Sequence, residues 1–385
     1  MTTQVYLVLA ACQYPGGLLE RSRRPKPNGP LTDSANLPGP SDHAFRRWLH
    51  RNSEIQISQS SRADLVMTGD QIYVDATAGL FDPRQRDAPL ERAYATLGKE
   101  VWRNMAIENF KHVALMDDHE VGDNWEPSAH VARNSQLEAD MAAAISLFLQ
   151  KQRGIEHPPA RPSLFGPAQL LSGHCLFIGD SRTERSVRDA RDLKAARIMS
   201  SEQMGALVST LGRAPAAAWK FVATSSILLP RRLTTVESTS GAAIRSDAWD
   251  GYPSSLHEVL GHIVDCGLKN CVFLSGDEHI PCVAEITLQR NGVDRTVVKL
   301  WSVHAGALYA PYPFANAVPE DFAEMDSFDF VSPSGASWTA TVVAYFPEHL
   351  DDGFLEITGT DGAPLEVVFR SAHGADRDHA FAHLI

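Results

Sequence analysis

Short apolar runs that stop abruptly at residues able to bind a metal ion or move a proton constrain the fold of this chain most. Four such runs occur, and the residues at which they stop are Cys12, Asp70, Asp117 and Asp277. Each run is four to eight residues long. None alternates between apolar and polar residues, which is typical of strands buried on both faces. The sequence therefore predicts several buried strands with polar side chains at their carboxyl ends.

Longer helical patterns separate these runs, at 89–106, 128–150 and 254–268. Ser200 and Gln203 form a capping-box start for a further helix. Strands that alternate with helices predict a layered α/β (α+β) architecture, in which the carboxyl ends of the strands open onto the ligand crevice. We therefore expect the four polar strand ends to converge on one site. Further strands are expected at 175–179, 220–227, 297–304 and 338–346.

The last part of the chain carries two more extended patterns, at 353–359 and 364–370. We expect a catalytic domain over 1–345 and a C-terminal β-rich extension over 346–385 that packs on the same domain. Long surface loops are expected at three polar or Pro/Gly-rich stretches, 24–40, 158–173 and 231–250.

The composition of the chain limits the binding partners and cellular locations that are expected for it. With 47 Asp and Glu against 35 Lys and Arg, the 385-residue chain has a formal net charge of −12, which disfavours nucleic acid as a partner. The five cysteines are odd in number and form no Cys-x-x-Cys pair, so we expect reduced surroundings. No apolar run reaches the ~18 residues of a membrane span. Residues 9–12 resemble a lipoprotein attachment box, but the preceding stretch is short and lacks Lys and Arg. A cytoplasmic protein is expected, with a lipoprotein anchored through Cys12 as the alternative.

The strand ends carry metal-ligand chemistry. Asp117, Asp118, His119 and Glu120 are consecutive, and three carboxylates so close together repel one another unless a cation compensates them. Asp277 and His279 are spaced to point the same way from an extended segment. A Cys12 thiolate and a Tyr73 phenolate would favour a ferric ion. Considered one at a time, these residues also have purely structural explanations. Asp70 could be a turn residue, the tetrad a solvated acidic turn, and Cys12 a buried packing residue.

Seven motifs in order along the chain resemble those of the PhoD-like (alkaline phosphatase D) metallophosphatases. They are Ala11-Cys12-Gln13, Gly69-Asp70-Gln71-Ile72-Tyr73, Asp117-Asp118-His119-Glu120 with Asn124-Trp125, Gly179-Asp180-Ser181-Arg182, Ser201-Glu202-Gln203, Asp247-Ala248-Trp249-Asp250-Gly251-Tyr252-Pro253 and Ser275-Gly276-Asp277-Glu278-His279. They span roughly residues 8 to 310, and an ordered set is more specific than any single motif.

The resemblance implies a calcineurin-like four-layer β-sandwich flanked by helices, and phosphate ester hydrolysis at an Fe³⁺ and Ca²⁺ centre. By this resemblance the metal ligands are Cys12, Asp70, Tyr73, Asp118, Asp277 and His279, with Asp70 bridging the two metals. It also makes His119 the imidazole that contacts the substrate phosphate. Whether Asp117 or His304 joins the site stays open at this point. The β-rich domain and the export signal that often precede the catalytic domain in this family are not evident, which puts an extracytoplasmic location in doubt.

The expected mechanism is hydrolysis of a small-molecule or polymeric phosphate ester by a metal-activated water. His119 would protonate the leaving group, and Arg133 is a candidate for an additional phosphate contact. Two alternatives remain. One is a serine esterase that uses Ser181 and His379, and the other is a protein that binds a phosphorylated ligand through its metals without turnover. The sequence does not distinguish monoester from diester substrates.

Overall fold

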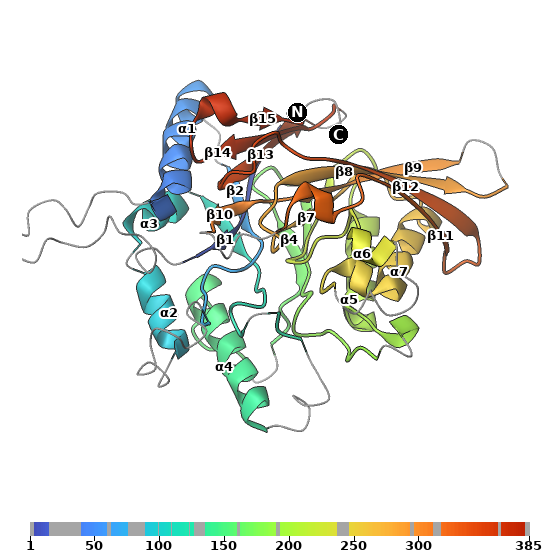
Figure 1. The fold of residues 1–385 in the computed structure, drawn as a ribbon, viewed down its shortest axis with the longest axis horizontal. Helices are drawn as coiled ribbons and strands as arrows, with labels where there is room; N and C mark the ends of the chain where they lie inside the picture. Colours follow the sequence, from blue (N-terminus) through green and yellow to red (C-terminus); the bar gives the residue numbers. More distant parts are fainter. Residues whose placement is uncertain are drawn as a thin grey trace, which may run out of the picture.

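The computed structural model describes residues 4–14, 40–59, 63–75, 89–98, 100–108, 110–122, 124–126, 135–159, 162–189, 193–236, 246–292, 296–310, 317–360 and 363–381. Within these ranges the chain forms two mixed β-sheets with helices on their outer sides (Figure 1). No helix in the described ranges is both long enough and apolar enough to cross a membrane.

The first sheet is built around β1 and has the order β15-β14-β13-β1-β2-β3, with β10 also paired to β1. Its strands are β1 (Gln4–Gln13), β2 (Asp64–Met67), β3 (Lys111–Ala114), β10 (Ala307–Tyr309), β13 (Gly353–Thr360), β14 (Glu366–Ser371) and β15 (His379–Ala380). β1, β2 and β3 are parallel, so their carboxyl ends lie on the same edge. β13 pairs with β1 over six residues, so the C-terminal part of the chain lies at the centre of this sheet.

The second sheet has the order β11-β12-β8-β9-β7-β6-β5-β4. Its strands are β4 (Gly166–Gln169), β5 (Cys175–Ile178), β6 (Lys220–Ala223), β7 (Cys271–Ser275), β8 (Cys282–Arg290), β9 (Val297–His304), β11 (Met325–Val331) and β12 (Ser337–Tyr345). β5, β6, β7 and β9 are parallel, whereas β8, β11 and β12 form an antiparallel extension.

The two sheets pack face to face, and side chains of alternating direction separate the layers. From β1, Val5, Leu7 and Leu9 enter the core between the sheets, whereas Tyr6 and Val8 point to the outer face. This alternation follows from the two-residue repeat of a strand. The helices of the structure are α1 (His43–Gln59), α2 (Pro89–Leu97), α3 (Val101–Glu108), α4 (Ser135–Gln152), α5 (Ser201–Arg213), α6 (Leu233–Val236) and α7 (Pro253–Asp265).

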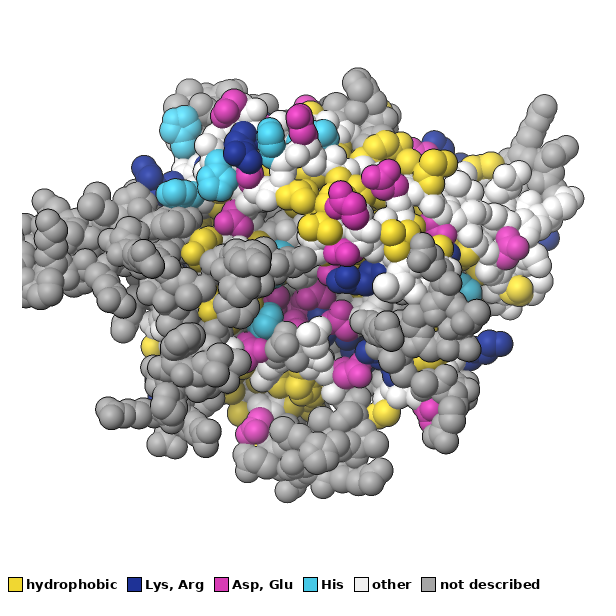
Figure 2. Space-filling view, in the orientation of Figure 1, with side chains coloured by type: hydrophobic (Ala, Val, Ile, Leu, Met, Phe, Trp, Pro, Cys, Tyr) yellow, Lys and Arg dark blue, Asp and Glu magenta, His cyan; other side chains and the backbone are white. Residues whose placement is uncertain are grey.

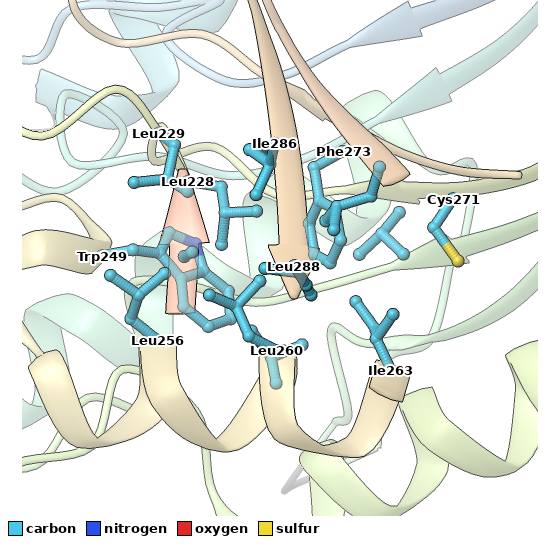
Figure 3. Packing of buried hydrophobic residues seen from close by; sticks show 14 of the residues in the cluster. Leu228, Leu229, Trp249, Leu256, Leu260, Ile263, Cys271, Phe273, Ile286 and Leu288 are labelled. Carbon is cyan, nitrogen blue, oxygen red and sulfur yellow. The ribbon is translucent and has the colours of Figure 1, made fainter. Parts of the chain in front are cut away.

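Helices cover both outer faces, which confirms the predicted four-layer sandwich. α1 packs on the outer face of the first sheet through Ala44, Phe45 and Trp48. α5 and α7 cover the second sheet, where Leu256, Leu260 and other residues of α7 contact Phe273 of β7 and Ile286 of β8 (Figure 3). Trp249 is fully buried in the same core. The sheets are therefore held rigidly, and their carboxyl ends are fixed relative to one another.

Several sequence expectations need correction. The helix expected over 89–106 is broken after Gly98 into α2 and α3, and the stretch 158–173 contains β4 rather than only a loop. The expected capping box is half formed: Ser200 Oγ accepts from the Gln203 N–H, but the Gln203 side chain bonds the backbone of Asp180 instead. α4 begins at Ser135, and 128–134 and 24–40 lie outside the described residues apart from Pro40.

Candidate metal centre

The polar strand ends of both sheets meet at one place, as the sequence predicted. Two glycines allow this close approach. A Cβ on Gly69, which has φ +116°, would collide with Asp117 at the end of β3. A Cβ on Gly276, after β7, would collide with Ala11 of β1 and with Thr68. Because neither position tolerates a side chain, the loops after β1, β2, β3 and β7 lie close together.

Candidate ligand atoms from these loops form three overlapping groups. The groups are Cys12, Asp70 and His279; Asp70, Asp118 and His119; and Asp70, Asp117, Asp118 and Asp277. Within each group the ligand atoms lie within 4.8 Å of one another, and Asp70 belongs to all three. Cys12 Sγ lies 3.4 Å from Asp70 Oδ2, and the Tyr73 hydroxyl lies 3.3 Å from His279 Nε2. The structure thus brings together the six sequence-predicted ligands, with Asp70 at their centre.

The backbone at this centre adopts conformations that L-residues rarely take. Positive φ angles occur at Cys12 (54°), Asp70 (53°), Asp277 (94°) and His279 (57°). Such conformations are typical of functional sites, where the surrounding fold holds strained residues in place. They also correct one expectation: the segment with Asp277 and His279 is not extended, because both residues have positive φ angles in a bend after β7.

Arg182 is the main positive charge among these carboxylates, and no role for it was expected from the sequence. Its side chain is completely buried. It donates to Asp117, to Asp247 and, at 2.6 Å, to Asp277, and it lies 3.5 Å from Asp118. Asp117, whose part in the site the sequence left undecided, therefore belongs to this cluster. Asp247 also contacts Arg182, and the sequence did not predict it. A motif containing Arg182 was visible, but its partners come from loops far away in the sequence.

The carboxylates outnumber the cations that face them. Asp70, Asp117 and Asp277 are buried and surrounded by further acidic groups. Burial, and then repulsion by the neighbouring carboxylates, raises the pKa of each carboxyl. The pKa rises to about 6 for Asp117 and well above the ordinary range for Asp70 and Asp277. Burial and the same carboxylates also raise the pKa values of the Cys12 thiol and the Tyr73 phenol well above their usual ranges. Protein groups alone therefore leave the charged forms of these ligands poorly compensated.

The residues fit a bound cation. Among the described residues, Asp117 Oδ2 and Asp118 Oδ1 are buried and have no hydrogen-bond partner, although Asp118 Oδ1 lies 3.5 Å from Arg182 Nη2. Both aspartates belong to one group of candidate ligands. Oxygen donors from aspartates beside a thiol, a phenol and an imidazole suit a transition metal on the Cys12 side and a harder cation on the aspartate side. In Figure 2 acidic side chains gather with histidine in a hollow in the middle of the visible face. His119 and His279 are part-exposed, so a ligand can reach the centre.

His119 stands beside the ligands and is oriented by two neighbours. Its Nδ1 lies 2.8 Å from Asp75 Oδ1, and its ring stacks on Tyr73 with centroids 4.2 Å apart. Burial lowers its pKa, but the Asp70 charge and the hydrogen bond with Asp75 raise it more, to about 10. A cation on Asp70 would offset part of this increase. The arrangement holds the imidazole beside the candidate ligands.

Glu120 has a different role from the other acids of its tetrad. Its carboxylate accepts from the N–H groups of Asp70, Gln71 and Asp117 at 2.8–3.2 Å, and Ile72 N lies 3.4 Å away. The carboxylate is fully buried and joins the loop after β2 to the loop after β3. It therefore positions the ligands without occupying the ligand space.

We expect Glu120→Ala to lower the free energy of unfolding by about 3 kcal/mol or more, because several buried N–H groups lose a charged acceptor. Glu120→Gln keeps one acceptor oxygen and should lose less. Chemical denaturation of the three proteins measures the difference. Equal stability of Glu120→Ala and wild type would show that the carboxylate does not join the loops.

His304, the other residue left open, is fully buried at the end of β9. Its Nδ1 lies 2.9 Å from Ser275 Oγ, Nε2 has no partner, and it is in none of the ligand groups of the described residues. Burial, together with the positive charge of His279, lowers its pKa to about 3.

This pKa predicts a pH dependence of stability. Between pH 6.5 and 3 the unfolded chain binds a proton at His304 that the folded chain does not, so wild type should lose about 1.4 kcal/mol per pH unit relative to His304→Gln as the pH falls. Denaturation of both proteins in chelator across this range measures the difference. Parallel curves would mean that His304 is protonated in the fold.

The structure separates the residues of the alternative esterase site. Ser181 Oγ is buried and bonds Ser225 Oγ at 2.8 Å. His379 lies in β15, at an edge of the other sheet, with its ring 4.7 Å from that of Phe381. A serine and histidine so placed do not form a catalytic pair. Arg133 lies outside the described residues.

Comparison with known proteins shows to which family the chain belongs. A model of the PhoD-like phosphatase family matches residues 56–328, which is more than half of the chain. The chain belongs to the PhoD-like phosphatase family. This PhoD-like chain also resembles a solved structure of PhoD, with a TM-score of 0.56 at 16% sequence identity. That similarity covers 96% of this chain but 66% of the PhoD chain, and it supports the shared fold. No curated protein sequence gives a significant match.

Proposed function

We propose that this PhoD-like protein is a metal-dependent phosphoric ester hydrolase, acting as a phosphodiesterase or phosphomonoesterase. The observation that carries the proposal is the buried cluster around Asp70, in which candidate ligands from four strand ends lie within 4.8 Å of one another inside their groups. Bound metal would stabilise charge on the transferring phosphoryl group and lower the pKa of an attacking water. The residues divide into ligands, a proton donor and positioning groups.

The ligand set has two chemically different sides that meet at Asp70. Cys12, Tyr73 and His279 offer sulfur, phenolic oxygen and nitrogen, and these donors favour Fe³⁺. Asp118 and Asp277 offer carboxylate oxygens, which suit Ca²⁺. Asp70 has ligand atoms close to both sides and would bridge them. Asp117 Oδ2 has no hydrogen-bond partner among the described residues, and Asp117 could contribute to the second side.

His119 is the proposed general acid. Asp75 binds its Nδ1, and Tyr73 packs against its ring, so the imidazole is fixed with Nε2 directed away from its support. A protonated Nε2 can donate to the leaving-group oxygen as the phosphorus–oxygen bond breaks. Arg133 remains a candidate for a phosphate contact by sequence alone.

Arg182 is proposed to orient the ligands. It binds Asp117, Asp247 and Asp277 from one side, and a guanidinium with five fixed donors suits this task better than an ammonium. By holding one oxygen of Asp277, it leaves the other free for a metal. The residue thus offsets part of the negative charge of the ligand cluster.

Substrate class can be tested with two synthetic esters, p-nitrophenyl phosphate and bis-p-nitrophenyl phosphate. Purified protein should release p-nitrophenolate from at least one of them, and the ratio of the two rates gives the preference for monoester or diester. A serine-directed phosphonate should not inhibit. Phosphate ester binding without release of product would instead favour a non-catalytic phospho-ligand binding protein, and phosphonate inhibition would favour the esterase.

A cytoplasmic location and the division into 1–345 and 346–385 also remain proposals. The pairing of β13 with β1 supports a C-terminal segment that is integral to the catalytic body.

A further inference from the structure

A second cavity, lined largely by basic side chains, lies between α1 and the end of β14. Its volume is about 610 Å³, and it shares no residue with the metal centre. Among the described residues, four arginines, three histidines and one carboxylate line it, and the lining is His43, Arg46, Arg47, His50, Arg51, Arg370, Ala372, His373, Gly374, Ala375 and Asp378. In Figure 2 histidine and basic side chains gather over this part of the molecule, apart from the acidic hollow.

The basic residues of α1 are spaced to form one continuous face. His43, Arg46 and His50 recur at three- and four-residue intervals, and Arg47 and Arg51 lie beside them. The opposite face carries Ala44, Phe45 and Trp48, which are fully buried against the first sheet. Because packing fixes that apolar face, the basic face is held toward the cavity.

On the side of the cavity opposite α1, two carboxylates hold guanidinium groups in position. Asp378 Oδ2 accepts from Arg47 at 2.7 Å and from Arg370 at 2.9 Å. Behind them Glu356 accepts from Arg370 at 2.6 Å and lies 3.3 Å from Arg51. These two carboxylates thus hold three arginines in place, and Arg46 lines the same cavity.

The geometry is preorganised. The side chains of Arg47 and Arg370 are only 19% and 17% exposed, so their rotamer entropy is largely lost before any ligand arrives. The His43 and His373 rings, which both line the cavity, pack edge to face with centroids 6.4 Å apart. A fixed cluster of guanidinium donors with nearby imidazoles matches the oxygens of a phosphate group. This gathering of arginines and histidines occurs on a chain with a net charge of −12.

We propose that this cavity is a second binding site, independent of the metal centre, for a phosphate-bearing anion. The ligand is either a soluble phosphate or the phosphate of a lipid headgroup, and the shared recognition chemistry is charge-assisted hydrogen bonding to phosphate oxygens. The site does not depend on hydrolysis, because none of its residues belongs to the proposed catalytic machinery.

The test compares wild type with the double variant Arg46→Gln/His50→Gln and with Arg290→Gln, an exposed arginine at the end of β8 that serves as the control. Both substituted cavity residues are exposed, so the fold should be kept. Binding of inorganic phosphate is measured by equilibrium dialysis on the full, metal-loaded chain. Wild type and the control should show a binding component that weakens about tenfold or more in the double variant. Ester hydrolysis should be the same in all three.

This difference is expected whether or not the metal centre also binds phosphate, so its failure and the failure of the proposed hydrolase are distinguishable. Sedimentation with vesicles of phosphatidylcholine, with and without phosphatidic acid, separates the two ligand sources. Binding of soluble phosphate without vesicle binding identifies a soluble ligand, and binding only to phosphatidic acid vesicles identifies a headgroup. Unchanged binding in the double variant by both assays, or an equal loss in Arg290→Gln, would overturn the proposal.

Discussion

Asp70→Asn is expected to remove bound metal and to lower ester hydrolysis by about 10³-fold or more. Asp70 is completely buried, belongs to all three groups of candidate ligands and lies 3.4 Å from the Cys12 sulfur. An amide keeps the size of the side chain but removes the negative charge that would bridge two cations. Metal analysis of the purified variant, together with its turnover, measures both losses.

The matched control is Asp329→Asn, an exposed aspartate of β11 outside the cluster. It should retain the metal content and activity of wild type. The variant at Asp70 should also fold, because removing one of several repelling carboxylates relieves the charge that raises their pKa values. Full metal content and full turnover in Asp70→Asn would show that Asp70 does not bridge the metals.

His119→Ala is expected to lower turnover by about 10²-fold or more while the metal content stays near that of wild type. The reason is its position: the imidazole contacts Asp75 and Tyr73, and its backbone N–H lies 3.3 Å from Asp70 Oδ1. It is thus next to the ligand groups, and it is part-exposed, so a substrate can approach it. The loss should fall on kcat rather than on metal affinity.

A leaving-group series distinguishes a proton donor from a residue that merely packs. If His119 protonates the leaving oxygen, His119→Ala should lose most activity toward esters of poorly acidic alcohols and least toward p-nitrophenyl esters, whose leaving group needs no proton. His174→Ala, a histidine at the start of β5 that bonds Ser172, is the control and should behave like wild type. An equal loss on all esters, or loss of metal, would contradict the assigned role.

The sequence predicted the buried strands and their polar ends well because buried parallel strands have a clear sequence pattern. Each needs apolar residues on both faces, and polar residues can follow only where the strand reaches the crevice. β8 and β11 were not predicted from continuous apolar runs, because part-exposed polar residues interrupt their sequences. The break between α2 and α3 was missed because Gly98 lies within an otherwise continuous helical pattern.

The cluster itself was only partly predictable. Cys12, Asp70 and Tyr73 were found because they sit in local motifs at strand ends. Arg182 and Asp247 were not, because the contact between them joins residues 65 positions apart, and only the packed fold shows that the guanidinium faces the acids. The role of Glu120 was hidden for the same reason, since most of its partners are backbone N–H groups of another loop.

Chelation followed by metal restoration tests the central claim most directly. Hydrolysis of bis-p-nitrophenyl phosphate and p-nitrophenyl phosphate is measured on purified protein, after removal of metal, and after addition of iron, calcium or both. The account predicts that activity disappears with the chelator and returns with metal in wild type, but does not return in Asp70→Asn. Activity that survives complete removal of metal would contradict it.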